Sequence, residues 1–275
     1  MRCNNNSGDC MKKQKNQIEL KIVVCCPSYK RAKVETLKYI PFCKVYVDES
    51  EYKEYCRCND GAEIVKCKKG IQGNIARVRN YIIDTEFKNG ADVVCIVDDD
   101  MREIMYWEQN TIHRLKTENI MSFIFKYSVL ASDMGCYLWG LNVNSDKQCY
   151  REYSPFSTVS PVLAPFSCHI RGSEIRYDEN IPLKEDYDFF IQHMNKYRKV
   201  LRVNKYYYNV RQSEQAGGCA VLRNIEEEEE EELHLLQKKW GSKIVKIDKQ
   251  DRSNKSSKKK ALDYNPIIKV PIKGI

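Results

Sequence analysis

The sequence lacks an uninterrupted stretch of about 18 apolar residues, the length that a membrane-spanning helix requires. Residues 1–15 are polar and basic, and they lack the apolar segment of a secretory signal. These two absences exclude a membrane protein of the helical kind and predict a protein that stays in a cytoplasm.

The 13 cysteines lack the paired C-x-x-C spacing of a typical zinc site. Their odd number and the missing secretory signal argue against a disulfide framework, because reducing compartments keep thiols free. The cluster Cys43, Cys56, Cys58 and Cys67 is irregularly spaced. We expect core or surface thiols, with a structural zinc as the less favoured alternative.

Charge is present in excess, with a formal net charge of +8 and a pI near 8.7. A basic balance suits polyanionic partners such as nucleic acid, phosphates or an anionic membrane face. Much of the excess lies in residues 12–15 and 255–260, where charged tails are often simply solvated. Charge alone therefore does not distinguish a protein with a polyanionic partner from one with merely solvated basic tails.

Segments of strand length alternate with helical segments over the first hundred residues. Strands are predicted at residues 19–26, 44–47, 63–67 and 91–97, with helices at residues 31–40, 49–56 and 74–87. Such alternation is typical of βαβ units and predicts an α/β fold with an open, mostly parallel sheet flanked by helices.

The remaining chain continues this pattern less regularly. Helices are predicted at residues 118–133 and 183–197, strands at 136–142 and 200–208, and a helical, basic C-terminal extension after the acidic run 226–232. Residues 154–168 are rich in Ser and Pro and show no regular period. We predict a disordered leader over residues 1–16, one domain over 17–247 and a basic tail over 248–275.

Polar side chains follow three of the predicted strands. Ser28, Tyr29 and Arg31 come after the first strand, Asp48 after the second, and residues 98–100 after the fourth. Ligands of open α/β sheets bind beyond the carboxyl ends of the strands. The sequence therefore predicts a ligand site at this edge.

Asp98, Asp99 and Asp100 end a buried strand, where adjacent like charges repel unless a cation is present. Asp98 and Asp100 point the same way in an extended segment. Together they can hold a hard divalent cation, whose remaining ligands a pyrophosphate would supply. The alternative is a solvated acidic turn or a helix cap, and the position at the sheet edge favours the metal.

Glu185 and Asp186 begin the helix predicted at residues 183–197. A carboxylate there could act as the general base that deprotonates an acceptor hydroxyl. The alternative is helix capping, with Asp188 at the surface. The position downstream of the aspartates favours function.

Five segments resemble motifs of GT-A glycosyltransferases: residues 23–31 (VVCCPSYKR), 74–80 (NIARVRN), 94–100 (VCIVDDD), 185–186 (ED) and 238–241 (KKWG). Residues 47–52 (VDESEY) and the aspartate triplet resemble the TET-associated glycosyltransferases, mainly phage and prophage enzymes proposed to glycosylate hydroxymethylated pyrimidines in DNA. This resemblance implies a GT-A fold, a UDP-sugar donor such as UDP-glucose or UDP-N-acetylglucosamine, Mn²⁺ or Mg²⁺, double-stranded DNA carrying 5-hydroxymethylcytosine or a related base as acceptor, and a host cytoplasm if the protein is viral.

The resemblance also implies roles for individual residues. Donor binding is implied for Pro27, Ser28, Tyr29, Arg31, Asp48, Arg77, Asn80, Asp98 and Asp99, metal binding for Asp98 and Asp100, and base catalysis for Asp186 first and Glu185 second. Basic and aromatic residues that could contact DNA are Lys68, Lys69, Arg102, Arg114, Tyr106 and Trp107.

One departure concerns the metal. Many GT-A enzymes carry a late His ligand, which residues 211–218 lack, so that only His169 and His193 are available. Rival interpretations are a transferase for protein, lipid or glycan acceptors and a nucleic-acid-binding module on a degenerate fold. A nucleotidyltransferase would need a Gly-rich phosphate loop, which residues 27–29 do not provide.

Overall fold

The computed structural model describes residues 19–143, 150, 153–210, 225–247 and 265–272. Its elements are β1 (Ile22–Pro27), η1 (Glu35–Lys38), β2 (Lys44–Val47), α1 (Tyr52–Cys58), β3 (Ile64–Lys66), α2 (Ile75–Lys88), β4 (Val93–Val97), β5 (Met101–Glu108), β6 (Thr111–Arg114), η2 (Thr117–Asn119), α3 (Ile120–Asp133), β7 (Leu138–Asn142), β8 (Phe156–Ser157), β9 (Phe166–Ile170), α4 (Glu185–Tyr197), β10 (Leu201–Val210), α5 (Ile225–Trp240), β11 (Val245–Lys246) and β12 (Ile267–Ile268). The predicted order of strands and helices is largely confirmed.

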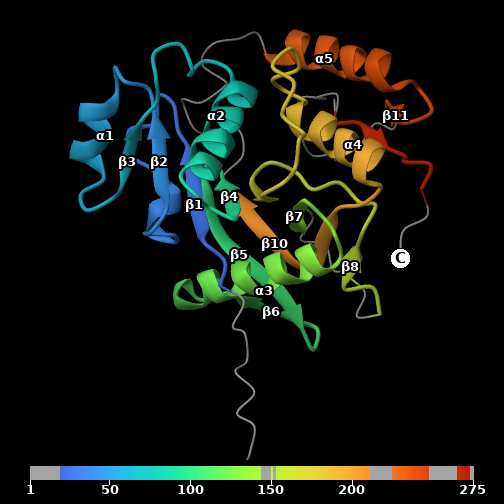
Figure 1. The fold of residues 1–275 in the computed structure, drawn as a ribbon, viewed down its shortest axis with the longest axis horizontal. Coiled ribbons are helices and arrows are strands. Elements are labelled where there is room, and N and C mark those ends of the chain that lie inside the picture. The colour runs from blue at the N-terminus through green and yellow to red at the C-terminus, as the bar shows by residue number, and fades with distance from the viewer. Residues whose placement is uncertain (1–18, 144–149, 151–152, 211–224, 248–264, 273–275) are drawn as a thin grey trace, which may run out of the picture.

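One large sheet organises the molecule, in the order β3-β2-β1-β4-β9-β7-β10-β5-β6, with β8 paired to β10 (Figure 1). The predicted α/β class with an open sheet flanked by helices is confirmed. The strands β3, β2, β1 and β4 are parallel, as alternation with helices predicts. Beyond β4 the only parallel pair in the described part of the sheet is β7 with β10, and β9 runs antiparallel between β4 and β7.

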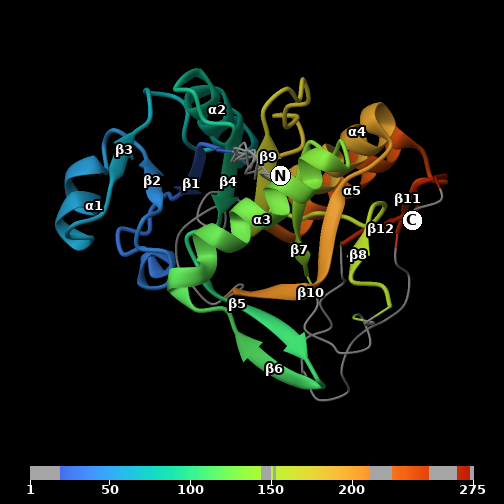
Figure 2. The same cartoon turned by 60° about the horizontal axis from the view of Figure 1, so that its bottom comes forward.

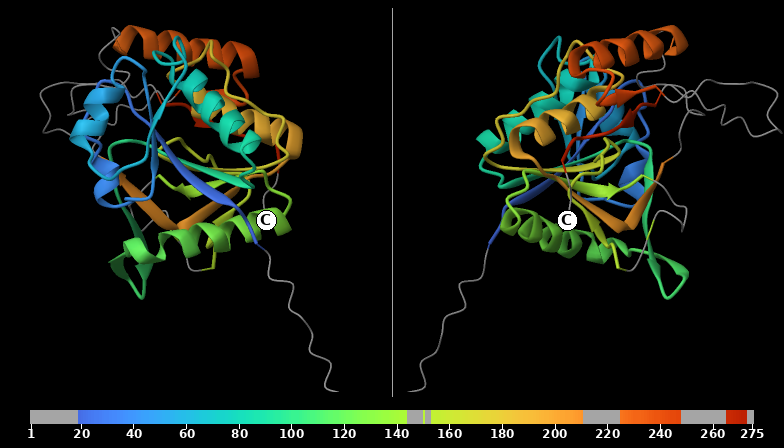
Figure 3. Two further views of the ribbon diagram at one scale, coloured as in Figure 1. Left: turned by 60° about the vertical axis from the view of Figure 1, so that its left-hand side comes forward. Right: turned by 90° about the vertical axis from the view of Figure 1, so that its right-hand side faces the viewer.

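Alternating side chains of β4 fill two cores, one on each face of the sheet. Val93, Cys95 and Val97 belong to the cluster that α3 covers, whereas Val94 and Ile96 face α2, α4 and α5. Figure 3 shows α3 on one side of the sheet and α4 with α5 on the other. All five side chains are fully buried, which explains why this strand reads as a continuous apolar run.

One expectation about local structure needs correction, and two further features were not predicted. The helix predicted at residues 31–40 is reduced to the short 3-10 turn η1. The Ser- and Pro-rich residues 154–168 contain β8 and the start of β9. The hairpin formed by β5 and β6, which lies at one end of the sheet and projects from it (Figure 2), was not predicted.

The ends of the chain are described only in part. Residues 1–16 and 211–218 lie outside the described residues. Within residues 248–275, β12 pairs with β11, and Ile268, Val270 and Ile272 pack against the core that contains α4 and α5. This part of the predicted tail therefore belongs to the domain. Within the described chain, no helix combines the length and the apolar character that crossing a membrane requires.

Candidate active site

A cavity of about 680 Å³ lies beyond the carboxyl ends of β1 and β4 and reaches the first turn of α4. This volume is in the range of small-molecule sites. Its lining residues include Pro27, Ser28, Tyr29, Arg31, Arg79, Asp98, Asp99, Asp100, Lys184, Glu185 and Asp186. The cavity thus lies at the sheet edge at which the sequence predicted a ligand.

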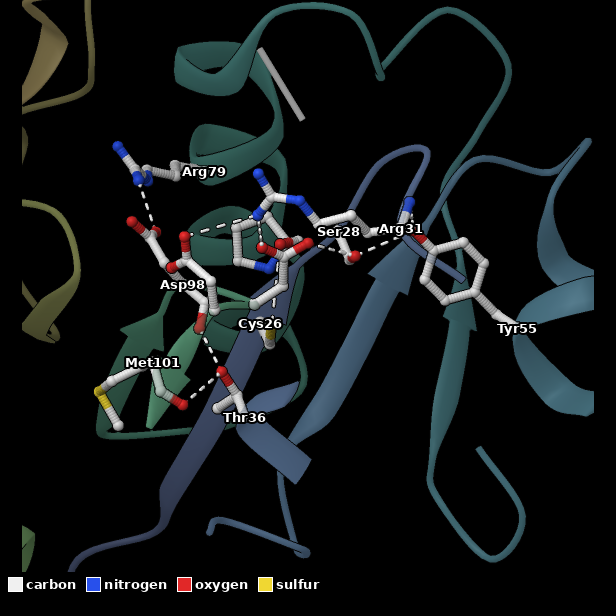
Figure 4. A network of polar contacts seen from close by, with 11 residues as sticks. Cys26, Ser28, Arg31, Thr36, Tyr55, Arg79, Asp98 and Met101 are labelled. Carbon is white, nitrogen blue, oxygen red and sulfur yellow. Dashed lines mark hydrogen bonds and ion pairs between the residues drawn. The ribbon is translucent and has the colours of Figure 1, made fainter. Parts of the chain in front are cut away.

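Asp99 joins the loop after β1 to the loop after β4. Ser28 donates a hydrogen bond from Oγ to Asp99 Oδ2 at 2.6 Å, and Arg31 Nη1 lies 2.5 Å from Asp99 Oδ1 (Figure 4). The Asp99 side chain is only 9% exposed. Burial raises the pKa of Asp99, and Arg31 opposes that shift. Asp99 is therefore committed to holding the two loops together.

Thr36 fixes the backbone of the aspartate triplet from below. Its Oγ1 donates to the carbonyl oxygen of Asp98 at 2.5 Å and lies 3.1 Å from that of Met101, and its amide donates to the carbonyl of Asp99 (Figure 4). These bonds fix the backbone of residues 98–101, from which the Asp98 and Asp100 side chains line the cavity.

Asp98 and Asp100 keep part of their carboxylate surface exposed, with side-chain exposures of 27% and 16%. Burial, together with the charges of Asp98 and Asp99, raises the pKa of Asp100 to about 6. A divalent cation at this point would relieve the repulsion, and carboxylate oxygens are ligands that Mn²⁺ and Mg²⁺ accept. The residues therefore fit such an ion.

The protein offers only part of a coordination shell. Among the described residues, no group of three or more His, Cys, Asp or Glu side chains could hold a metal. An ion held by Asp98 and Asp100 would thus take its other ligands from a bound phosphate group and water.

Arg79 is the site residue that sequence reasoning missed. Its side chain is 3% exposed, its Nη2 lies 2.9 Å from Asp98 Oδ1, and its Nη1 contacts Glu185 Oε1. Burial alone would lower the pKa of Arg79, but the negative charges of Asp98 and Glu185 have the larger combined effect and raise it. Arg79 thus connects the aspartate triplet to the start of α4.

Helical periodicity contained the signal for Arg79. The buried face of α2 carries Ala76, Val78, Ile82 and Ile83, and Arg79 lies on that same face at spacings of three and four residues. A charged residue within an apolar helix face requires a buried partner.

Glu185 and Asp186 lie in the first turn of α4 and both line the cavity. Burial raises the pKa of Glu185 to about 8 despite the contact with Arg79. Burial also raises the pKa of Asp186, whose oxygens accept hydrogen bonds from the amides of Ala164 (3.3 Å) and Tyr187 (2.7 Å). Two carboxyl groups with raised pKa values at a cavity wall are candidates for proton transfer.

Three residues predicted to bind the donor do not line the cavity. The carboxylate of Asp48, after β2, accepts hydrogen bonds from the amide and hydroxyl of Ser50. Arg77 forms an exposed ion pair with Glu179 at 2.8 Å.

Asn80 has a structural position in α2. Its side chain donates to the carbonyl of Tyr177 at 2.9 Å and accepts from the amide of Tyr177 at 2.8 Å. It therefore fixes the segment that precedes α4.

The two histidines considered as further metal ligands lie in the core. His169 and His193 are 3% and 0% exposed, and neither lines the cavity. Burial lowers the pKa of both rings. The Ser167 hydroxyl contacts His169, and the carbonyl of Phe189 contacts His193. Neither ring is therefore placed to join a metal ion held by Asp98 and Asp100.

The cysteine cluster does not converge on a metal either. Cys43 and Cys67 are buried, whereas Cys56 and Cys58 are exposed, and all of them are free thiols. The expectation of core and surface thiols is therefore confirmed for these four residues.

The residues predicted to contact DNA lie outside the cavity. Lys68, Lys69 and Arg102 are exposed. Tyr106 stacks on His113 with ring centroids 5.3 Å apart, and Trp107 lies beside it on β5. Strand β5 pairs with β10, whose last residues, 208–210, form part of the cavity wall. The hairpin thus extends outward from that wall.

Comparison with known proteins gives one family match. A family model described as TET-Associated Glycosyltransferase matches residues 36–218. No curated protein matches the sequence.

Solved structures with a related arrangement share little sequence with the chain. S. aureus TarS 1-349 has 13% identity and a TM-score of 0.44, over 79% of this chain and 64% of that chain, so this chain spans less than two thirds of it. Glucosyl-3-phosphoglycerate synthase from Mycobacterium tuberculosis, in complex with Mn²⁺, uridine-diphosphate and phosphoglyceric acid, has 12% identity and a TM-score of 0.49, over 82% and 81%. A197 from STIV has 13% identity and a TM-score of 0.41, over 72% and 89%.

Proposed function

The chain belongs to the TET-associated glycosyltransferase family, and from this premise we propose that it transfers a hexose from a UDP-sugar to a hydroxymethylated pyrimidine in DNA, with 5-hydroxymethylcytosine as the first candidate. The donor is UDP-glucose or UDP-N-acetylglucosamine, and the reaction depends on Mn²⁺ or Mg²⁺. The observation that carries the proposal is one cavity lined by Asp98, Asp100, Glu185 and Asp186, in which Arg79 links Asp98 to Glu185.

The donor side of the cavity consists of the loops after β1 and β4. Tyr29 and Arg31 would contact the nucleotide, while the hydrogen bond between Ser28 and Asp99 holds these two loops together. Asp98 and Asp100 would hold the divalent cation, which supplies Lewis-acid stabilisation of the departing diphosphate.

Asp186 is our first choice as the base. Its partners are uncharged backbone amides, which orient the carboxylate, whereas Glu185 is engaged by the guanidinium of Arg79. The acceptor oxygen bonds to the anomeric carbon as the bond from that carbon to the diphosphate breaks, and the hydroxyl proton passes to Asp186. Such a single displacement inverts the anomeric centre.

Several apolar and aromatic side chains line the cavity beside its charged groups. This apolar lining consists of Val143, Leu163, Ala164, Pro165, Pro182, Leu183, Tyr187, Tyr208 and Val210. Such side chains suit a flat heteroaromatic ring better than a hydrated glycan, since glycan hydroxyls would lose their hydrogen bonds to water. This composition supports a base that is flipped out of the duplex as the acceptor.

A transfer assay tests the proposal. The full chain is incubated with Mn²⁺, labelled UDP-glucose or UDP-N-acetylglucosamine, and duplexes that contain cytosine, 5-hydroxymethylcytosine or 5-hydroxymethyluracil. We expect label only on a hydroxymethylated duplex, and none with Asp100→Ala. The matched control is Asp60→Ala, because Asp60 is exposed and lies outside the cavity lining.

Other outcomes discriminate between the rivals. Hydrolysis of the donor without transfer to any duplex would redirect the search to protein or glycan acceptors. Salt-sensitive DNA binding without donor turnover would favour a non-catalytic nucleic-acid-binding module.

A further inference from the structure

Helix α5 lies beside α4, on the side of the sheet away from α3 (Figures 1 and 3). Leu233 and Leu236 are 2% and 0% exposed and bury the apolar face of α5 in the core shared with Phe189 and Phe190 of α4. Apolar contacts alone would stabilise this helix pair, but the polar contacts between them converge on the turn that carries Glu185 and Asp186.

Glu232 holds the chain immediately before that turn. Its Oε2 accepts hydrogen bonds from the amide of Leu183 at 2.5 Å and from the amide of Lys184 at 3.1 Å. The side chain is 7% exposed. A buried carboxylate bonded to two successive amides fixes the backbone at the entrance to α4.

Asp188 holds the turn from its other end. Its side chain is fully buried, and its Oδ1 accepts a hydrogen bond of 2.7 Å from Trp240 Nε1. Lys239 Nζ lies 2.9 Å from the same oxygen, and Gln192 donates to Oδ2 at 2.6 Å. The last turn of α5 therefore provides the donors that make burial of this carboxylate tolerable.

These contacts form a continuous path to the cavity. Asp188 lies three residues after Glu185 on the same helix face, Glu185 contacts Arg79, and Arg79 binds Asp98. We propose that Glu232, Lys239 and Trp240 are positioning residues, which act through Asp188 and the residue 183–184 backbone to hold Glu185 and Asp186 against the donor site. The inference rests on the proposed function for its catalytic consequence.

The burial of Asp188 also explains the motif KKWG at residues 238–241. Lys239 and Trp240 contact Asp188, although the Lys239 side chain is itself 34% exposed. Gly241 follows in the left-handed conformation with φ of +85°, which glycine adopts readily and which ends α5 directly after Trp240. The alternative with Asp188 at the surface is thereby wrong.

The test uses three variants of the full chain. Trp240→Phe keeps an aromatic ring and removes the N–H donor. Lys239→Met removes the positive charge, whereas Lys239→Arg keeps it. Lys238→Met is the matched control on the same turn of α5, because the Lys238 side chain is exposed and forms no hydrogen bond or ion pair with the described residues.

Two readouts separate a positioning role from a merely structural one. In Trp240→Phe and Lys239→Met we expect kcat to fall about tenfold or more with the donor KM unchanged, because a small misplacement of a catalytic group slows chemistry without weakening binding. We also expect faster hydrogen exchange at residues 183–188. Lys239→Arg should retain most of the wild-type kcat, and Lys238→Met should match the wild type.

The outcomes are decisive in either direction. Faster exchange with unchanged kcat, or equal losses of kcat in all α5 variants including Lys238→Met, would overturn the inference. If the wild-type protein transfers no sugar at all, the proposed function fails, and unchanged exchange at residues 183–188 would then overturn the positioning role separately.

Discussion

Arg79 has the role of a shared counter-ion between Asp98 and Glu185. All three side chains line the cavity, and Arg79 is 3% exposed, so that water contributes little to compensating the charge of Arg79. A buried carboxylate that loses its partner keeps the desolvation cost without the attraction. The neighbouring Arg77 pairs with Glu179 at side-chain exposures of 39% and 44%, where solvent screens the pair.

The two arginines of α2 therefore form a matched pair for mutation. We expect Arg79→Met to lower the free energy of unfolding by about 3–5 kcal/mol, because the partly buried Asp98 loses its counter-ion and the buried Glu185 loses its hydrogen-bond donor. Arg77→Met should cost less than about 1 kcal/mol. Urea unfolding at pH 7 measures both. Equal losses would show that Arg79 does not carry the charge balance of the site.

The same residue shows what the sequence could and could not reveal. The segment NIARVRN drew attention to Arg77 and Asn80 through its resemblance to a family motif. Helical spacing alone would have selected Arg79, since it shares the face of Val78 and Ile82. Its partner Glu185 lies 106 residues further along the chain, and no local pattern predicts such a contact.

At the scale of elements, α4 carries Glu185 and Asp186 in its first turn and the buried His193 near its end. His193 Nδ1 lies 2.9 Å from the carbonyl of Phe189, and Nε2 lies 3.3 Å from the hydroxyl of Ser173. A neutral ring that donates from Nδ1 and accepts at Nε2 satisfies both contacts. Burial lowers the pKa of His193 to about 4.

This lowered pKa predicts an acid-dependent loss of stability. The unfolded chain takes up a proton near the ordinary pKa of about 6.5, whereas the folded ring resists it down to about 4. The stabilisation is therefore complete above pH 6.5 and is lost as the pH falls towards 4. Relative to wild type, His193→Gln should gain up to about 3 kcal/mol in unfolding free energy between pH 7 and pH 4.

Chemical unfolding at a series of pH values measures this difference. The control is His234→Gln, because the His234 side chain is 58% exposed. Its difference from wild type should not change with pH. If His193→Gln behaved in the same way, the histidine would not be buried in its neutral form.

Elements that follow a simple period were predictable, and those that depend on turn chemistry were not. The parallel strands β1 and β4 are continuous apolar runs, and α2 has a clear apolar face. The β5–β6 hairpin turns at Gln109 and Asn110, both with positive φ, of +46° and +64°. Such a turn is usually signalled by Asn-Gly or Asp-Gly, and Gln-Asn lacks that signal.

At the scale of the whole molecule, the sheet order decides which segments meet. The carboxyl ends of β1 and β4 lie at the same edge of the sheet, as predicted, because these strands are parallel neighbours. The insertion of β9 beside β4, antiparallel to it, was not predictable, since its Ser- and Pro-rich surroundings mask a short strand. The sequence thus indicated the donor side of the cavity better than its apolar lining, to which residues 163–165, just before β9, contribute.

The measurement closest to the central claim is calorimetric titration of the protein with UDP, with and without Mn²⁺. The account predicts that UDP binds measurably only when Mn²⁺ is present, that Asp100→Ala abolishes this binding, and that Asp60→Ala retains it, because Asp98 and Asp100 would hold the ion that bridges protein and diphosphate. UDP binding of equal strength without the metal, or binding that survives in Asp100→Ala, would contradict a metal-dependent donor site in this cavity.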